Sequence, residues 1–235
     1  MIFRQLFDDQ SSTYTYLLAD DSRREALLID PVVEKVEQYL QLLRELNLTL
    51  KYAIDTHTHA DHITALGSLR DKTGCVTIMG EFTKADCVSQ RVSDGDDITL
   101  GAIQLKALFT PGHTNESFSF YLSGGAEPCV FTGDCLLIRG SGRTDFQGGD
   151  AGKSFDSIQT LFALPDDTYV YPGHDYKGWT RSTIAEEKAS NPRLAGKSRD
   201  EYIEIMNNLD LPDPKMMDIA VPANLACGQT AFRSQ

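Results

Sequence analysis

The sequence of 235 residues has no apolar run near the roughly 18 residues that a membrane-spanning helix needs. Residues 1–7 show neither the basic start and apolar core of a signal peptide nor an Arg-rich, Ser-rich transit sequence. The five cysteines are odd in number and none are in CxxC spacing. We therefore expect no membrane association, reduced thiols and a cytoplasmic location.

Positive charge is also scarce in this chain. Lysine and arginine total 22 against 34 aspartates and glutamates, which gives a net charge of −12. Such a surface repels phosphate backbones, so we expect no nucleic-acid partner.

What the chain does contain is enough apolar material for a large core, with 41% hydrophobic and 24% charged residues. Strand-like and helix-like segments alternate along it, which predicts an α/β fold. We expect a single domain over residues 1–235 with a helical C-terminal extension, whose last residues, 229–235, are loose.

The elements follow from hydrophobic patterning. Strands are expected within 2–30 (three short ones) and at 50–55, 75–79, 98–109, 117–122, 129–132 and 168–171. Asp30 and Pro31 are typical of a helix start, with Asp30 as the N-cap, and apolar residues then recur at spacings of three and four up to Leu46. Further helices are expected at 63–71, 155–164, 183–190 and 199–209.

All five histidines lie in three short segments, 57–62, 110–114 and 171–175. Each segment directly follows a predicted strand, and Gly133-Asp134 closes another. Ligands and catalytic groups of layered α/β folds gather at such strand ends.

The residue types in these segments suit a metal ion, because imidazole and carboxylate are the usual ligands of Zn, Fe and Mn. His57 and His59 are two residues apart and can face one side of an extended segment, with Asp61 and His62 beside them. A single histidine is more often a core or surface residue than a ligand. The dense HxHxDH cluster instead favours a metal site, because buried polar groups need partners and a cation can be that partner.

HxHxDH, then TPGH, Gly-Asp and PGH, resembles the metallo-β-lactamase superfamily. That resemblance implies an αββα sandwich with the metal site along one edge. Four longer segments, at 133–147, 171–178, 191–194 and 221–228, resemble the persulfide dioxygenases. The similarity extends over nearly the whole chain, to about Gly228, and the segments after Gly133 and Tyr171 are its specific parts.

Two arrangements of the metal site are open from the residues, because every side chain that either needs is present. The hydrolytic relatives imply two zinc ions, held by His57, His59 and His113 on one side and Asp61, His62 and His174 on the other, with Asp134 between them. The persulfide dioxygenases imply one Fe(II) per chain on His57, His113 and Asp134. In that case the residues that orient the ligands are His59, Asp61, His62, His174 and Asp175.

The resemblance also implies the reaction, in which glutathione persulfide and O₂ give sulfite and glutathione. Arg143 is the first candidate for binding a glutathione carboxylate, and an ion pair with Asp145 or Asp175 is its structural alternative. Tyr176 is a second candidate, with a plain core tyrosine as the alternative.

The rival enzyme is a glyoxalase II-like hydrolase that cleaves acylated glutathione at a dinuclear metal site. It shares HxHxDH and the fold, but not the continuations after Asp134 and His174. A homodimer is expected only by analogy with relatives.

Overall fold

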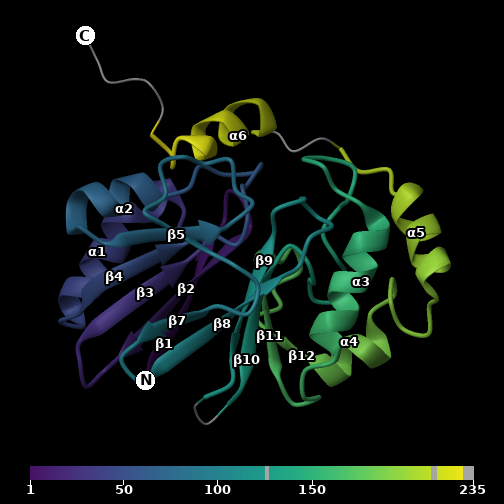
Figure 1. Cartoon of the computed structure of the whole chain (residues 1–235), viewed down its shortest axis with the longest axis horizontal. Helices are drawn as coiled ribbons and strands as arrows, with labels where there is room; N and C mark the ends of the chain where they lie inside the picture. Colours follow the sequence, from purple (N-terminus) through teal and green to yellow (C-terminus); the bar gives the residue numbers. More distant parts are fainter. Residues whose placement is uncertain (125–126, 213–215, 230–235) are drawn as a thin grey trace. The chain divides into compact units, whose positions relative to one another are not determined.

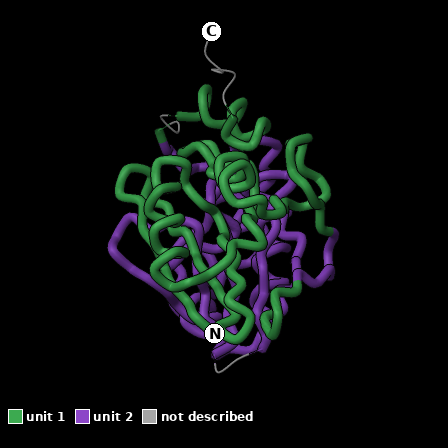
Figure 2. Tube along the Cα trace, turned by 90° about the vertical axis from the view of Figure 1, so that its left-hand side faces the viewer, with its two compact units in different colours: residues 1–92, 99–103, 212–235 green, residues 93–98, 104–211 purple. Residues whose placement is uncertain are grey.

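A computed structural model describes residues 1–124, 127–212 and 216–229 of the chain. The expected loose tail therefore lies outside the described residues from residue 230 onward. The chain forms two compact units: the first consists of residues 1–92, 99–103 and 212–235, the second of 93–98 and 104–211 (Figure 2). The expectation of a single domain stays a prediction.

The first unit contains a six-stranded sheet in the order β1-β2-β3-β4-β5-β6 (Figure 1). The strands are β1 (Ile2–Asp8), β2 (Thr13–Asp20), β3 (Glu25–Ile29), β4 (Thr49–Ile54), β5 (Val76–Gly80) and β6 (Gln90–Val92). β3 to β6 are parallel to one another and β2 is antiparallel to β3. The ends of β3 and β4 and the start of β2 therefore share one edge of the sheet.

Helices α1 (Val36–Glu45), α2 (Leu66–Thr73) and α6 (Met217–Leu225) belong to this unit. The apolar stripe of α1 buries Tyr39 and Leu43 in a core that also contains Leu28, Ala53 and Leu69. This confirms the predicted amphipathic helix, because the spacing of three and four residues places its apolar side chains on the sheet.

The second sheet has the order β12-β11-β10-β9-β8-β7. Its strands are β7 (Asp97–Leu100), β8 (Ile103–Phe109), β9 (Phe118–Leu122), β10 (Cys129–Gly133), β11 (Tyr169–Pro172) and β12 (Ser182–Thr183). Helices α3 (Ala151–Phe162), α4 (Ile184–Ser190) and α5 (Arg199–Asn207) complete the second unit. Its core includes Val130, Ile158, Leu161, Val170 and Tyr202.

Strand direction decides where the loops of the second sheet emerge. β9 is antiparallel to both β8 and β10, and β11 is parallel to β10. β8, β10 and β11 therefore run the same way and end at the same edge of the sheet.

The start of the first long helix differs from the prediction. Asp30 is not an N-cap: it has a positive φ of 52°, and a short 3₁₀ turn, η1 (Val33–Lys35), precedes α1, which begins at Val36. The carboxylate of Asp30 instead accepts hydrogen bonds from the backbone and hydroxyl of Thr56, beyond β4. The Asp30 side chain therefore bonds to the residue that follows β4 and does not cap a helix.

Two other elements also differ. The strand expected at 98–109 is divided into β7 and β8 by a turn at Gly101, whose φ of 59° suits glycine. Helix α6 was not predicted, because Pro222 lies inside it and proline is unfavourable in helix interiors.

The cysteines contradict the expectation of reduced thiols for one pair. Cys87 and Cys227 form a disulfide within the first unit, across a sequence separation of 140 residues. Cys75, Cys129 and Cys135 are free and buried. A pairing between such distant positions leaves no spacing motif in the sequence. The cytoplasmic location stays a prediction.

Within residues 1–124, 127–212 and 216–229, none of the helices has the length and apolar character required to cross a membrane.

The state of the cysteines can be counted with a thiol reagent. Unfolded, unreduced protein should react at three thiols, and at five after reduction. Native protein should react slowly near pH 8.5, about the pKa of a free cysteine, because the thiolate is the reactive form. Burial raises the pKa of both Cys129 and Cys135 to about 12. Five reactive thiols without reductant would contradict the disulfide.

Candidate metal centre

Three of the predicted site residues leave the second sheet at one edge. His113 follows β8, Asp134 follows β10 directly, and His174 follows β11. Because these strands run in the same direction, their terminal loops are brought together without a long excursion of the chain. The histidine and carboxylate segments of the sequence are thus neighbours within this unit, as predicted.

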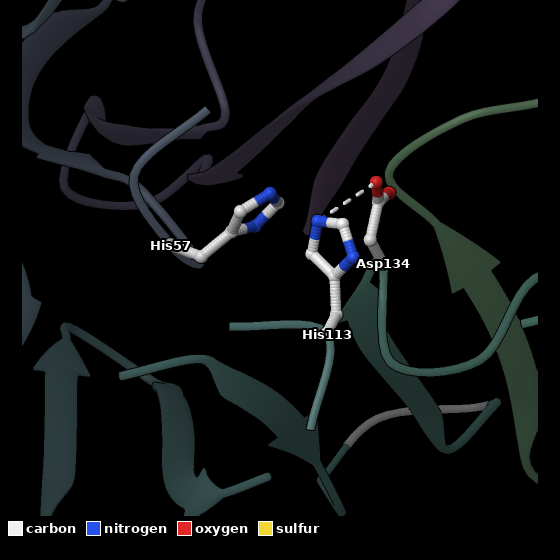
Figure 3. Close-up of side chains that lie close together, drawn as sticks. All are labelled: His57, His113 and Asp134. Atoms are coloured by element: carbon white, nitrogen blue, oxygen red, sulfur yellow. Dashed lines mark ion pairs between the residues drawn. The ribbon is translucent and has the colours of Figure 1, made fainter. Parts of the chain in front are cut away.

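The tautomer of His113 is fixed by the backbone. Its Nδ1 lies 2.8 Å from the carbonyl oxygen of Arg143, which can only accept, so Nδ1 carries the proton. In the neutral imidazole Nε2 then carries the lone pair, and it lies 3.5 Å from Oδ2 of Asp134 (Figure 3). A metal-binding imidazole is commonly held in this way, with its other nitrogen donating to a backbone carbonyl.

Asp134 is held from its other side by His174. Nδ1 of His174 lies 2.7 Å from Oδ1 of Asp134, and the His174 side chain is buried. The side chains of His113 and Asp134 are each 13% exposed. One carboxylate oxygen is therefore oriented by a buried imidazole and the other faces His113, which leaves the pair accessible and ordered.

Two glycines permit this close packing. A Cβ on Gly142 would lie 2.3 Å from the Asp134 carbonyl oxygen and 2.8 Å from Nδ1 of His113. A Cβ on Gly173 would lie 2.9 Å from Oδ1 of Asp134. The loops after β10 and β11 can approach Asp134 and His113 this closely only because Gly142 and Gly173 lack a side chain.

The first unit carries the HxHxDH segment between β4 and α2. His57, His59 and His62 are all buried, and their rings form a row with centroids 4.2 and 4.3 Å apart. The hydroxyl of Thr56 lies 2.9 Å from Nδ1 of His57. Ring contacts and this hydrogen bond fix the orientation of the segment.

Asp30 controls the charge of His59. Its Oδ1 lies 3.2 Å from Nε2 of His59, and both side chains are buried. Burial alone lowers the pKa of His59, but the charge and hydrogen bond of Asp30, with the charges of Asp55 and Asp61, together outweigh it and raise the pKa to about 9. Asp30 and Asp55, which follows β4, form with His59 a group whose ligand atoms lie within 4.8 Å of one another.

A second carboxylate group lies beside it. Asp61 lies 2.9 Å from Nδ1 of His62, and Thr13, at the start of β2, contacts both residues. His59, Asp61 and His62 also bring their ligand atoms within 4.8 Å of one another. Among the residues that the structure describes, the buried Nδ1 of His59 has no hydrogen-bond partner. Imidazoles, carboxylates and this buried nitrogen fit a metal ion well.

The two residues predicted to bind substrate lie in the second unit. Arg143 forms a two-pronged ion pair with Asp145, at 2.7 and 2.8 Å, which is the contact expected of its structural alternative. Its role in substrate binding stays a prediction. Tyr176 is 71% exposed, so it is not a core tyrosine, and its ring stacks on His174. Asp175 accepts hydrogen bonds from the backbone of Lys177 and Trp179 and so shapes the loop that carries Tyr176.

Sequence reasoning missed residues that hold the candidate ligands in place. We assigned Asp30 to helix capping. It directly follows a predicted strand, as Asp134 does, and this position could have identified it as a residue of the site. Thr13 and Asn224 gave no local signal, because their partners in the HxHxDH segment lie at least 48 residues away.

The chain matches a superfamily of known proteins. The model of the metallo-beta-lactamase superfamily matches residues 8–86 and 88–174, so the fold class predicted from the motifs is confirmed. Over 230 residues, 97% of this chain and 89% of the relative, the chain is 46% identical to the mitochondrial persulfide dioxygenase ETHE1 of Mus musculus.

Solved structures agree. The crystal structure of ETHE1 from Myxococcus xanthus matches with a TM-score of 0.94 and 56% identity, covering 97% of this chain and all of the other. The chain belongs to the persulfide dioxygenase family of the metallo-β-lactamase superfamily.

The rival enzyme class gives a weaker similarity. A probable hydroxyacylglutathione hydrolase of Schizosaccharomyces pombe is 35% identical over 173 residues, which cover 73% of this chain and 66% of that protein. The glyoxalase II-like alternative is thus a more distant relationship than the family assigned above.

Gly142 offers a test of the packing around His113 and Asp134. The Gly142→Ala variant should bind metal about 10-fold to 100-fold more weakly, as for other residues that support ligands, because its Cβ displaces the Asp134 backbone or the His113 ring. Titration with the metal against a chelator measures this. Gly140→Ala is the matched control in the same loop, since its nearest neighbour would be 3.9 Å away. Equal affinities of the two variants would contradict the packing described here.

Proposed function

We propose that this protein is a glutathione-dependent persulfide dioxygenase that uses one Fe(II) per chain. Its substrates are glutathione persulfide and O₂, and its products are sulfite and glutathione. The observation that carries this proposal is the similarity to persulfide dioxygenases along almost the entire chain. The orientation of His113 toward Asp134 supports it, because a neutral imidazole and a carboxylate are suitable iron ligands.

The proposed ligands are His57, His113 and Asp134. Two histidines and one carboxylate are the donor set of a facial triad, which would leave positions open for substrate and O₂. When bound, iron supplies the redox-active centre that O₂ chemistry requires and that zinc lacks.

The remaining residues of the histidine segments have positioning roles in this proposal. His174 holds Asp134, Asp30 holds His59, and Asp61 holds His62, each through a carboxylate–imidazole contact. Such contacts orient ligands and stabilise a cation.

Arg143 and Tyr176 are the proposed substrate contacts. The planar guanidinium of Arg143 suits a carboxylate of glutathione, which would exchange with or join Asp145. The ring of Phe146 lies 4.0 Å from the Arg143 guanidinium carbon and limits where the group can move. Tyr176 is exposed, lies two residues after His174 and stacks its ring on that imidazole, so its hydroxyl can meet a substrate bound near Asp134.

The overall reaction balances without a further reductant. One persulfide, one O₂ and one water give one glutathione, one sulfite and two protons. Both oxygen atoms of O₂ end on the outer sulfur atom, and the bond between the two sulfur atoms breaks. The protein contributes by holding the reactants together and by excluding bulk water.

One feature favours the dinuclear zinc layout of the hydrolytic relatives: the buried Nδ1 of His59, which would be a ligand there. Metal counting separates the two arrangements. Protein purified without O₂ should contain about one iron per chain and should consume O₂ rapidly when given glutathione persulfide. Two zinc ions per chain, thioester cleavage and no O₂ uptake would replace the dioxygenase with the hydrolase.

Two substitutions sharpen this test. Asp134→Ala should lose iron and activity together, because it removes a proposed ligand. His62→Ala should retain at least part of its iron, because His62 contacts Asp61 and Thr13 and is not a proposed ligand. Metal analysis and O₂ uptake measure both variants, and an equal loss of metal from the two would favour the dinuclear site.

The cytoplasmic location and the homodimer expected from relatives stay predictions. Sedimentation of the purified chain tests the second.

A further inference from the structure

One side chain of the C-terminal helix forms hydrogen bonds with the backbone of the HxHxDH segment. The amide of Asn224, at the end of α6, donates to the carbonyl oxygens of His59 and His62, both at 2.9 Å. Its Oδ1 accepts from the backbone nitrogen of Thr64, also at 2.9 Å. Both N–H groups and the oxygen of the amide are used, and Asn224 is 3% exposed.

No other residue type reproduces this set of bonds at the same position. Aspartate has the same shape but no donor, and glutamine places its amide one methylene further out. An unsatisfied buried carbonyl is costly, so replacing the two donors would force residues 59–62 to move. The segment that carries the proposed ligand His57 therefore depends on a residue 160 positions away.

The chain after Asn224 packs directly on the segment that follows the histidines. The carbonyl oxygen of Cys227 accepts from the backbone of Gly67, and a Cβ on Gly67 would lie 2.7 Å from that oxygen. A Cβ on Gly228 would lie 2.0 Å from the carbonyl oxygen of Thr64. The contact is between backbones and leaves no room for adjustment by side chains.

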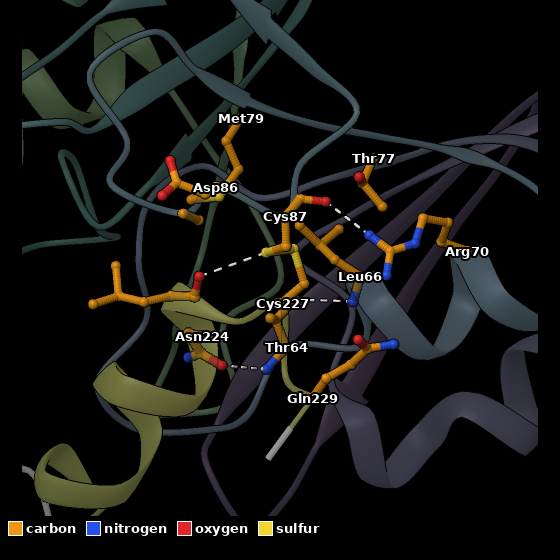
Figure 4. The surroundings of a disulfide bond; sticks show 12 residues. Thr64, Leu66, Arg70, Thr77, Met79, Asp86, Cys87, Asn224, Cys227 and Gln229 are labelled. Carbon is orange, nitrogen blue, oxygen red and sulfur yellow. Dashed lines mark hydrogen bonds between the residues drawn. A yellow bond between two sulfur atoms is a disulfide. The ribbon is translucent and has the colours of Figure 1, made fainter. Parts of the chain in front are cut away.

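This packing is locked covalently (Figure 4). Cys227 is bonded to Cys87, in the loop between β5 and β6, and its side chain is fully buried. Cys87 is partly exposed. A bond between positions 140 apart closes a long loop, and its removal restores freedom to the C-terminal segment.

We propose that Asn224 is the positioning residue of the HxHxDH segment and that the Cys87–Cys227 disulfide is a thiol-sensitive lock on it. The link to metal binding rests on the function proposed above. The thiol is of the glutathione class, which that reaction itself releases. The lock would therefore respond to the product of the enzyme.

The exchange has two balanced steps. A thiolate attacks the sulfur of the partly exposed Cys87, forms a mixed disulfide there and releases Cys227 as a thiolate. A second thiolate attacks the mixed disulfide and leaves Cys87 as a thiol and the two small thiols as their disulfide. The protein gains two electrons and the small thiols lose them.

The first test is the Asn224→Asp variant, compared with Asn208→Asp. Asn208 is an exposed asparagine at the end of α5, so the control has the same change of charge. N224D should accelerate amide exchange over residues 57–64 in metal-free protein. It should also lower the affinity for Fe(II), in competition with a chelator, by about tenfold.

A spectroscopic measurement separates positioning from general stability. The Co(II)-loaded N224D protein should show shifted visible absorption bands, because the ligand geometry changes. A residue that contributes only stability would lower the unfolding midpoint and leave these bands in place. Unchanged amide exchange and unchanged bands in N224D would overturn the positioning role.

The second test uses reduced glutathione on the wild-type chain and on Cys87→Ser. Thiol treatment of wild-type protein should yield two new free thiols, faster exchange at residues 57–64 and weaker Fe(II) binding. C87S should show the faster exchange and the weaker Fe(II) binding without treatment, with one new free thiol at Cys227, and should not respond to the thiol. An unchanged exchange rate and affinity after full reduction would overturn the lock. Should N224D not fold, this comparison examines the same segment without altering Asn224.

The two proposals fail in different ways. If wild-type protein binds no iron, the proposed function fails. Amide exchange over residues 57–64 of the metal-free protein still decides the role of Asn224. If wild-type protein binds iron and N224D matches it in affinity, exchange and absorption, only the role of Asn224 fails.

Discussion

The parallel direction of β8, β10 and β11 is the constraint on which the second unit depends. These strands end at one edge of their sheet, so the residues that follow them are neighbours although they are distant in sequence. His113, Asp134 and His174 each follow one of these strands. A reversal of any one strand would carry its side chain to the opposite edge.

Aspartate carboxylates contact histidine rings in both units, and each contact fixes the orientation of its ring. Asp134 meets His174, and Asp30 meets His59, at distances that fix the imidazole rings. In a chain of net charge −12, these acidic groups also create a favourable environment for a cation. The same groups that order the ligands thus favour the charge that they are proposed to bind.

Much of the fold and the candidate site could be predicted from the sequence. The three strands of residues 2–30, the stripe on α1 and the strand ends before His57, His113 and Asp134 all have local signals. Periodicity and Pro-Gly turns act over a few residues, so a single sequence displays them directly.

The features that could not be predicted are pairings between distant positions. Asp30 bonds to Thr56, 26 residues away, and local composition pointed to helix capping instead. Cys87 and Cys227 are 140 residues apart, and Asn224 contacts carbonyls more than 160 residues away. Packing of the whole unit decides which distant residues form contacts. The periodicity of the sequence does not indicate these contacts.

Arg143 takes part in two functions through different atoms. Its carbonyl oxygen determines which nitrogen of His113 carries the proton, while its guanidinium extends to Asp145. Replacement of the side chain spares the first function, whereas any shift of the main chain at this position alters both. The proton position on His113 is therefore set by a main-chain atom and does not depend on which side chain occupies position 143.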